Sequence, residues 1–127
     1  MSKPILCLDF DGVIHSYTTP WSDAATISDG PVEGAIGFML AALQVFDVVI
    51  YSSRSKDAGG VDAMKAWLRK HADGAWYETP LGPGIESVRF AHEKPAAFLT
   101  IDDRAFCFQG VWPDVAQLRA FKPWNKR

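Results

Sequence analysis

Leu6–Val13 reads Leu-Cys-Leu-Asp-Phe-Asp-Gly-Val, an apolar run that ends in two aspartates and a glycine. Alternate side chains of an extended chain share a face, so Asp9 and Asp11 are expected to project together, with Phe10 on the opposite side. Two carboxylates that close repel each other unless a cation, a shared proton or open water relieves the repulsion. A divalent metal ion is the obvious candidate for that cation.

The length and composition of the chain favour one domain that spans residues 1–127. Of its 127 residues, 48% are apolar, which is enough for one ordinary core. The net charge of -2 gives no general attraction to nucleic acid or anionic lipid. No apolar run approaches the roughly 20 residues that span a bilayer, and the start Met-Ser-Lys-Pro lacks a secretory signal. No membrane partner and a cytoplasmic location are therefore expected, with Cys7 and Cys107 as packed core thiols.

Strands and helices are expected to alternate along the chain. The expected elements, in order, are a strand over residues 4–9, a long loop over 12–30, a helix over 31–46, a strand over 47–52, a helix over 61–71, a short strand over 87–91, a strand over 95–101, a short fifth strand over 105–108 and a helix over 113–121, followed by a basic, solvated tail over 122–127. Such alternation is typical of an α/β domain with a mostly parallel sheet and right-handed crossovers.

Polar residues follow three of these strands at the point where each strand ends. Asp9 and Asp11 follow the first strand, Ser52 ends the second, and Asp102 and Asp103 follow the strand over 95–101. Ligands of parallel sheets bind outside the carboxyl ends of the strands. Three separate segments are therefore expected to bring their polar groups to one rim of the sheet.

Lys94 lies just before the last of these strands and completes a set of groups suited to phosphate. Carboxylates and waters suit Mg²⁺, which is commonly held by one or two carboxylates together with substrate phosphate oxygens. A lysine and a small hydroxyl are the usual partners of the remaining phosphate oxygens. Spare carboxylates in such a site serve as nucleophile and as general acid or base. The rim therefore predicts phosphate ester chemistry.

Four motifs in this order resemble those of the haloacid dehalogenase superfamily of phosphohydrolases. The first is Asp9-Phe-Asp-Gly-Val, the second Ser52, the third Lys94 and the fourth Asp102-Asp103. Lys94-Pro followed by Ile-Asp-Asp-Arg-Ala looks most like the nucleotidase and polynucleotide phosphatase branches. The resemblance implies an α/β fold, a three-layer Rossmann-like domain with a mostly parallel sheet. The gaps between motifs leave no room for a cap domain, so the enzyme is expected to be capless.

The resemblance implies a chemical role for each motif residue. Asp9 attacks phosphorus to form an aspartyl-phosphate, while Asp11 protonates the leaving oxygen and later activates water. Ser52 holds a phosphoryl oxygen, and Ser53 is the alternative for this role. Lys94 neutralises charge shared by the nucleophile and the phosphoryl group. The implied activity is the hydrolysis of a phosphomonoester through a covalent intermediate.

The resemblance also implies a Mg²⁺ site, formed by Asp9, Asp102 and the backbone carbonyl of Asp11. Asp103 ligates through a water or orients Lys94. An open rim is compatible with a large substrate such as a nucleic acid end. It is equally compatible with a phosphorylated small molecule, such as a nucleotide, that is covered by the 12–30 loop or by a partner subunit. The oligomeric state is left open.

Arg54 and Arg104 directly follow residues of the rim. Each is a candidate for binding a second phosphate or a nucleotide, and the equally weighted alternative is an ion pair with Asp57 or Asp103. The histidine and the aromatic residues of the 12–30 loop are expected mainly to pack the loop against the body.

Two other functions stay open on the sequence alone. A phospho-receiver signalling domain also gathers acidic residues, a hydroxyl and a lysine at strand ends. Such a domain needs its phosphorylated aspartate at the end of a middle strand, where this chain has Ser52. The third reading is a binding protein with weak or no catalysis, because function depends on the site and not on the fold.

Overall fold

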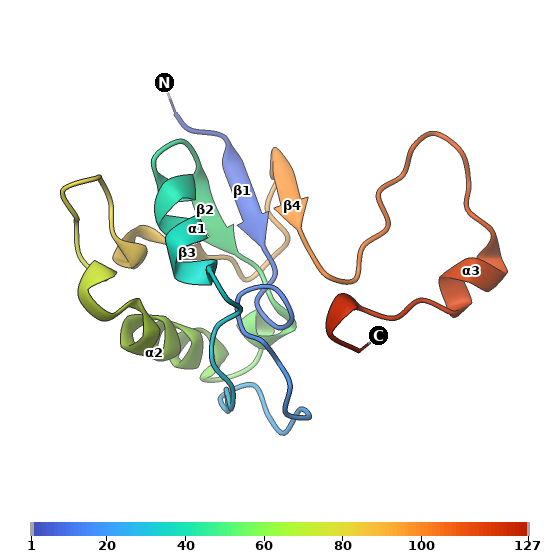
Figure 1. Ribbon diagram of the computed structural model, residues 1–127, viewed down its shortest axis with the longest axis horizontal. Helices are drawn as coiled ribbons and strands as arrows, with labels where there is room; N and C mark the ends of the chain where they lie inside the picture. Colours follow the sequence, from blue (N-terminus) through green and yellow to red (C-terminus); the bar gives the residue numbers. More distant parts are fainter. Residues whose placement is uncertain (1, 127) are drawn as a thin grey trace.

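A four-stranded sheet organises the computed structural model, which describes residues 2–126 (Figure 1). Its strands are all parallel and lie in the order β3-β2-β1-β4. They are β1 (Ile5–Leu8), β2 (Asp47–Ile50), β3 (Arg89–Phe90) and β4 (Leu99–Ile101). The expected α/β class with a parallel sheet is confirmed. The fifth strand expected over 105–108 is wrong, because those residues pair with no strand in the part of the chain described.

The two central strands are buried on both faces, which explains their continuous apolar sequence. Leu6 and Leu8 of β1 share a core with Val48 and Ile50 of β2, and Cys7 between them is buried as well. At the β3 end of the sheet, β3 pairs only with β2, and at the opposite edge β4 pairs only with β1. The strand that carries Asp9 at its end is therefore one of the two strands with a neighbour on each side.

Two helices, α1 (Ala35–Leu43) and α2 (Gly60–Ala72), pack on the same face of the sheet. The connections through them advance in the same direction, from β1 to β2 and from β2 to β3, so right-handed crossovers put both helices on one side. Met39 of α1 and Met64 of α2 accordingly lie in one core cluster. The helix expected to begin at residue 31 begins at Ala35, because Gly34 before it has a left-handed φ of 84°.

The opposite face of the sheet has no helical layer among residues 2–126. The chain returns from β3 to β4 through residues 91–98, which run without helix or strand from beside Ile50 to beside Ile5. A right-handed return in this direction places the segment on the face opposite α1 and α2. The expected three-layer arrangement is therefore corrected to one helical layer, the sheet and one extended segment.

Beyond β4 the chain forms an excursion over residues 104–121, called the arm here, which projects away from the sheet (Figure 1). Its one helix is α3 (Val115–Arg119), shorter than the 113–121 expected. Cys107 in the arm is exposed, so the expectation of a core thiol holds for Cys7 and is wrong for Cys107.

The tail expected to be solvated over 122–127 is largely exposed at Lys122, Trp124 and Lys126, but it also contacts the body, and Arg127 lies outside the described residues. Within the described part of this segment, Trp124–Lys126 form a 3-10 turn (η4). Trp124 donates its indole N–H to the carbonyl of Gly12 at 2.7 Å, and Asn125 donates its amide N–H to the carbonyl of Ser16 at 3.1 Å. The tail therefore packs against the loop that follows Asp11.

The remaining regular elements are three 3-10 turns, η1 (Ser53–Lys56), η2 (Asp73–Ala75) and η3 (Ile85–Ser87). Residues 12–30 contain no helix or extended strand, as expected of a loop. A membrane-crossing helix, which would need far greater length and apolarity than any helix here, is not found in residues 2–126.

Candidate metal and phosphate site

Three carboxylates meet at the carboxyl ends of β1 and β4. Asp9, Asp102 and Asp103 each contribute an oxygen, and these oxygens all lie within 4.8 Å of one another. They meet because the pairing of β1 with β4 continues one residue beyond the strands, where the N–H of Asp9 donates to the carbonyl of Ile101 at 3.0 Å. The expected grouping of the first and fourth motifs is thus present in the geometry. We call these residues the acidic cluster.

Charge crowding in the acidic cluster is strong enough to perturb protonation. Burial raises the pKa of Asp9 to about 8, helped by the hydrogen bond with Asp103 and by the negative charge of Asp102. One carboxylate oxygen of Asp103, Oδ1, is buried and has no hydrogen-bond partner among the described residues. A buried acceptor without a donor is rare and costly. Hard oxygen ligands, negative charge and an unsatisfied oxygen together fit Mg²⁺.

Gly12 lets the backbone pass directly beside this cluster. Its φ is +82°, and a Cβ at this position would overlap Oδ2 of Asp103. A side chain is thus excluded both by the left-handed backbone and by the neighbouring carboxylate. A cavity of about 250 Å³ adjoins the cluster and is lined in part by Gly12, Asp102, Asp103 and Trp124. The rest of its lining is apolar, from Val13, Val32 and Ile101, and Asp9 is not among the lining residues.

The carboxylate of Asp11 lies outside the acidic cluster and has its own partners. Its oxygens accept hydrogen bonds from Arg54 Nε at 2.9 and 3.1 Å, and Oδ1 lies 2.8 Å from Nδ1 of His15. Burial alone would raise the pKa of Asp11, but the hydrogen bonds from His15 and Arg54 outweigh it and hold the pKa below its usual value. The expectation that the side chains of Asp9 and Asp11 face one cation together is therefore wrong, whereas the metal role implied for the backbone carbonyl of Asp11 stays a prediction.

His15 is a partner of Asp11 that sequence reasoning missed, having treated it mainly as a residue that packs the loop against the body. Its ring is buried, and its Nε2 accepts the backbone N–H of Asp29 at 3.1 Å. With Nε2 an acceptor, the proton sits on Nδ1 and is donated to Asp11. Nothing in the sequence except the four-residue separation from Asp11 points to this contact.

Arg54 is buried, with 1% of its surface exposed, and does not face solvent at the rim as expected. Besides Asp11, it binds the 12–30 loop, where Nη1 donates to the carbonyls of Asp23, Ala24 and Thr26 at 2.9–3.1 Å. Trp21 covers its guanidinium at 4.6 Å. The pairing with Asp57 that was the alternative is also wrong, since its carboxylate partner is Asp11. Arg54 therefore holds the loop and Asp11 in place.

The other expected phosphate ligands make few contacts, and none of them contacts the acidic cluster among the described residues. Ser52 is buried at the end of β2, where its Oγ accepts the N–H of Arg54 at 3.2 Å, whereas Ser53 is exposed. Lys94 is exposed and forms no ion pair with any carboxylate of residues 2–126. Its positive charge nevertheless reaches Cys7, whose pKa is raised mainly by burial and lowered somewhat by Lys94.

Arg104 is exposed at the base of the arm and lines a groove with arm residues. It forms no ion pair with Asp103 within the described chain, so that alternative is wrong. Its backbone N–H instead donates to Oδ1 of Asp102 at 2.8 Å. This bond helps to orient one carboxylate of the cluster.

The site as a whole combines a place for a divalent cation, an adjoining cavity and a second, ionised carboxylate at Asp11. Such a set can bind a phosphoryl group and offers both a nucleophile and a base. Comparisons with models of protein families, with curated proteins and with solved structures gave no match to this chain.

Proposed function

We propose that this chain is a Mg²⁺-dependent phosphomonoester hydrolase of the haloacid dehalogenase type. The observation that supports this most directly is the acidic cluster, with its unsatisfied Asp103 oxygen and its crowded Asp9, at the carboxyl edge of a parallel sheet. Three clustered carboxylates are kept together most readily when a cation offsets their repulsion. Bound Mg²⁺ would supply that charge and polarise the phosphoryl oxygens.

Asp9 is the proposed nucleophile. An oxygen of its carboxylate bonds to phosphorus while the ester P–O bond breaks, and the alcohol leaves as the aspartyl-phosphate forms. Water then attacks the same phosphorus, the bond to Asp9 breaks, and inorganic phosphate is released. Lys94 and Ser52 are the residues proposed to bind the phosphoryl oxygens in both steps.

Asp11 is proposed to move protons in both steps, and its environment favours one of them. His15 and Arg54 keep its pKa low, so the carboxylate is ready to take a proton from the attacking water. The same low pKa leaves the group without a proton at neutral pH, so it has none to give to the leaving oxygen. Esters whose alcohols leave without protonation, such as aryl phosphates, are therefore expected to react faster than alkyl phosphates.

The test measures phosphate release from an aryl phosphate by purified protein with Mg²⁺ and with a chelator. Wild type is expected to turn over only with Mg²⁺, and Asp9→Asn to lose activity. Asp62→Asn is the matched control, because Asp62 is exposed in the first turn of α2, outside the cluster. Equal turnover by wild type and Asp9→Asn would refute the mechanism. Stable phosphorylation of wild type without turnover would instead indicate a phospho-receiver.

The proposed substrate class is a nucleotide or a phosphorylated nucleic acid end. This part of the proposal is supported by the motif resemblance and by the absence of a cap between the motifs, which leaves the rim open. A panel of nucleoside monophosphates, 3'-phosphorylated oligonucleotides and sugar phosphates, compared by kcat/KM, tests it. A clear preference for the sugar phosphates would contradict this substrate class.

A further inference from the structure

The arm exposes apolar side chains to an extent unusual for a chain of this size. They are contributed by both its extended part and α3, and include Phe106, Phe108, Trp112, Val115, Leu118 and Phe121. Trp112 is 84% exposed. Contiguous exposed apolar surface of this kind marks an interaction site.

The two ends of the arm are attached at the same place on the body. Asp103, just before the arm, lies against Gly12, and Trp124, just after it, donates to the Gly12 carbonyl. Between these points the chain leaves the body and returns, which Figure 1 shows as the orange and red excursion. The arm is thus a loop whose base is fixed and whose apolar residues lie away from its own core.

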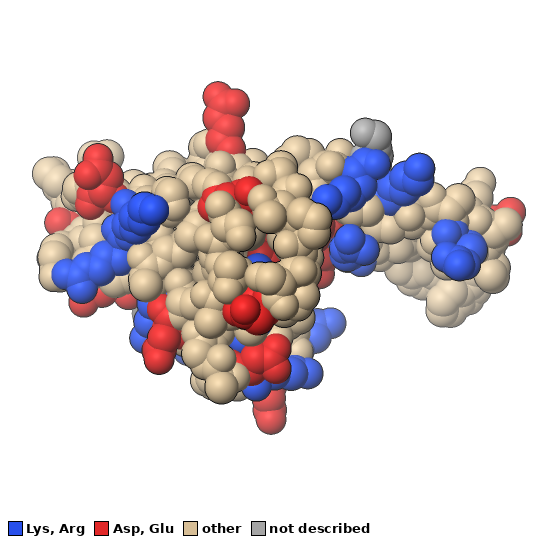
Figure 2. Space-filling model, turned by 90° about the horizontal axis from the view of Figure 1, so that it is seen from below, with Lys and Arg blue, Asp and Glu red and all other residues tan. Residues whose placement is uncertain are grey.

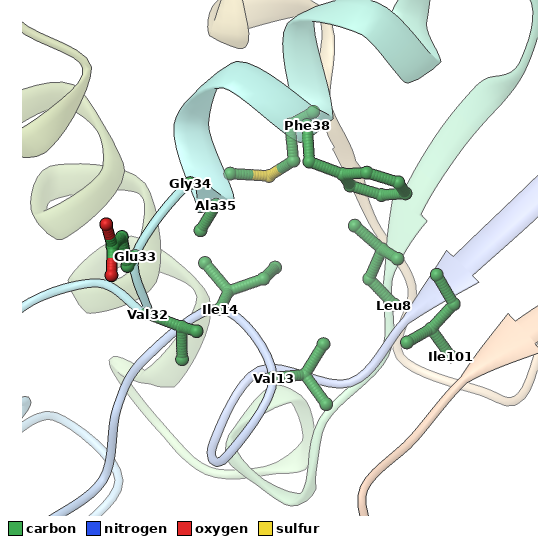
Figure 3. A pocket seen from close by; sticks show the side chains of 10 residues that line it. Leu8, Val13, Ile14, Val32, Glu33, Gly34, Ala35, Phe38 and Ile101 are labelled. Carbon is green, nitrogen blue, oxygen red and sulfur yellow. The ribbon is translucent and has the colours of Figure 1, made fainter.

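The body carries an uncovered apolar surface of matching character beside β4. A cavity of about 250 Å³ opens between α1, the start of the 12–30 loop and β4, with Leu8, Phe38 and Ile101 among its lining residues (Figure 3). Leu99 of β4 pairs with Leu6 and points to the same face, yet it is 54% exposed because no helix covers this edge. An apolar element is missing from this part of the fold.

The charges of the arm and the body are opposite in sign. The arm carries Arg104 and Arg119 against Asp114, a formal charge of +1, whereas the rest of the chain carries a formal charge of -3. In Figure 2 the arm end of the molecule is mostly uncharged, with basic groups and one acidic group at its tip, while both acidic and basic groups lie over the body. Opposite charges favour contact of an arm with a body and oppose contact between two arms.

We propose that two copies of this chain form a symmetric dimer in which the arm of each covers the apolar cavity and β4 edge of the other. A two-fold axis repeats the arm-to-body contact, so each copy contributes both surfaces. The exposed aromatic rings of one arm alone amount to on the order of 500 Å². Together with the body surface of the same copy, this approaches the ~800 Å² per partner of a stable interface.

The dimer is tested by measuring molar mass with light scattering and sedimentation across a range of concentrations. Wild type is expected to have the mass of two chains. Trp112→Glu in the arm and Phe38→Glu at the cavity are each expected to give monomers with unchanged circular dichroism. Leu81→Glu is the matched control, because Leu81 is 80% exposed on a turn that belongs to neither surface, and this variant is expected to stay dimeric.

The exposed thiol of Cys107 reports on the same contact directly, since Cys7 is buried and does not compete for a spin label. Labelled wild type is expected to show one intermolecular distance, which Trp112→Glu abolishes. A monomeric wild type, or a dimer unaffected by both Trp112→Glu and Phe38→Glu, would overturn the proposal. Mass and distance are measured without substrate, so a failure of the dimer leaves the proposed hydrolase untouched, and the reverse also holds.

Discussion

Gly12 is the residue at which backbone conformation and site chemistry constrain each other most tightly. We expect Gly12→Ala to destabilise the fold by the ~1–2 kcal/mol of a left-handed alanine and by about 1–3 kcal/mol more for overlap with Asp103. Gly34→Ala is the control, since Gly34 has a φ of +84° but no neighbour within 4 Å of a Cβ. Urea denaturation measures both. Equal losses would show that Asp103 moves aside without cost.

A second prediction at the scale of a residue concerns Asp9 and the dependence of folding stability on pH. Its pKa in the folded protein is raised to about 8 from a reference of 3.8. Without metal, the protonated carboxyl stabilises the fold fully below pH 3.8, and this contribution is lost as the pH rises toward 8. Mg²⁺ bound at the proposed site would compete with the proton, so its stabilising effect should grow over the same range.

Melting temperatures with chelator and with Mg²⁺, from pH 6 to pH 9, measure this. We expect the metal-free melting temperature to fall with pH and the gain from Mg²⁺ to rise. In Asp9→Asn both trends should be strongly reduced. A pH dependence shared by wild type and Asp9→Asn would assign the titration to another group.

At the scale of elements, Arg54 joins the end of β2 to the 12–30 loop. Arg54→Met leaves the largely buried Asp11 carboxylate with His15 alone and removes the Arg54 donor from the carbonyls of Ala24 and Thr26, whereas the Asp23 carbonyl keeps the N–H of Thr26. We expect a loss of about 3–5 kcal/mol in the free energy of unfolding, as for one partner of a buried ion pair.

Arg89→Met is the control for this prediction, because the Arg89–Asp47 pair is exposed and contributes about 0–1 kcal/mol. Urea denaturation compares the two variants. Limited proteolysis should also cut within residues 16–29 faster in Arg54→Met. Similar small losses in both variants would mean that the loop is held mainly by its other contacts, such as the bond from Trp67 to the carbonyl of Asp29.

Elements with a continuous or periodic apolar sequence could be predicted. Element boundaries that depend on a single backbone angle could not. β1 and β2 are continuous apolar runs, and α2 has a clear amphipathic face, so each was placed within about two residues. The start of α1 depends on the left-handed Gly34, which propensity does not reveal. The segment 105–108 has apolar residues suited to a strand but no neighbouring strand with which to pair.

The candidate site was likewise predictable from the sequence only in part. The meeting of Asp9 with Asp102 and Asp103 follows from the rule that parallel strands end at one edge. The contact of Asp11 with Arg54 joins residues 43 positions apart and depends on how the intervening loop folds back. No local sequence pattern indicates a contact between residues so far apart. The sequence therefore predicted Arg54 at the exposed rim and not in its buried position beside Asp11.

For the whole molecule, Trp124 determines whether the second end of the arm stays attached. Trp124→Phe removes the hydrogen bond to the Gly12 carbonyl and should cost about 1 kcal/mol. The freed arm is expected to be cleaved faster in limited proteolysis. Trp112→Phe, which alters an exposed ring without a hydrogen bond to its indole, serves as control. An unchanged cleavage rate in Trp124→Phe would show that Asn125 alone secures the tail.

The order of strands in the sheet also has a consequence for folding kinetics. β1 lies near the N-terminus, but one of its two neighbours in the sheet is β4. The pairing of Leu6 with Leu99 therefore joins residues that are far apart in the sequence. Closing so long a loop is slow, since its entropy is lost before the contact is formed. Asp102 and Asp103 directly follow β4, so the acidic cluster around Asp9 is incomplete until β4 has paired with β1. In refolding experiments Mg²⁺ binding should therefore be the final event, and the rate at which it appears should report completion of the native sheet.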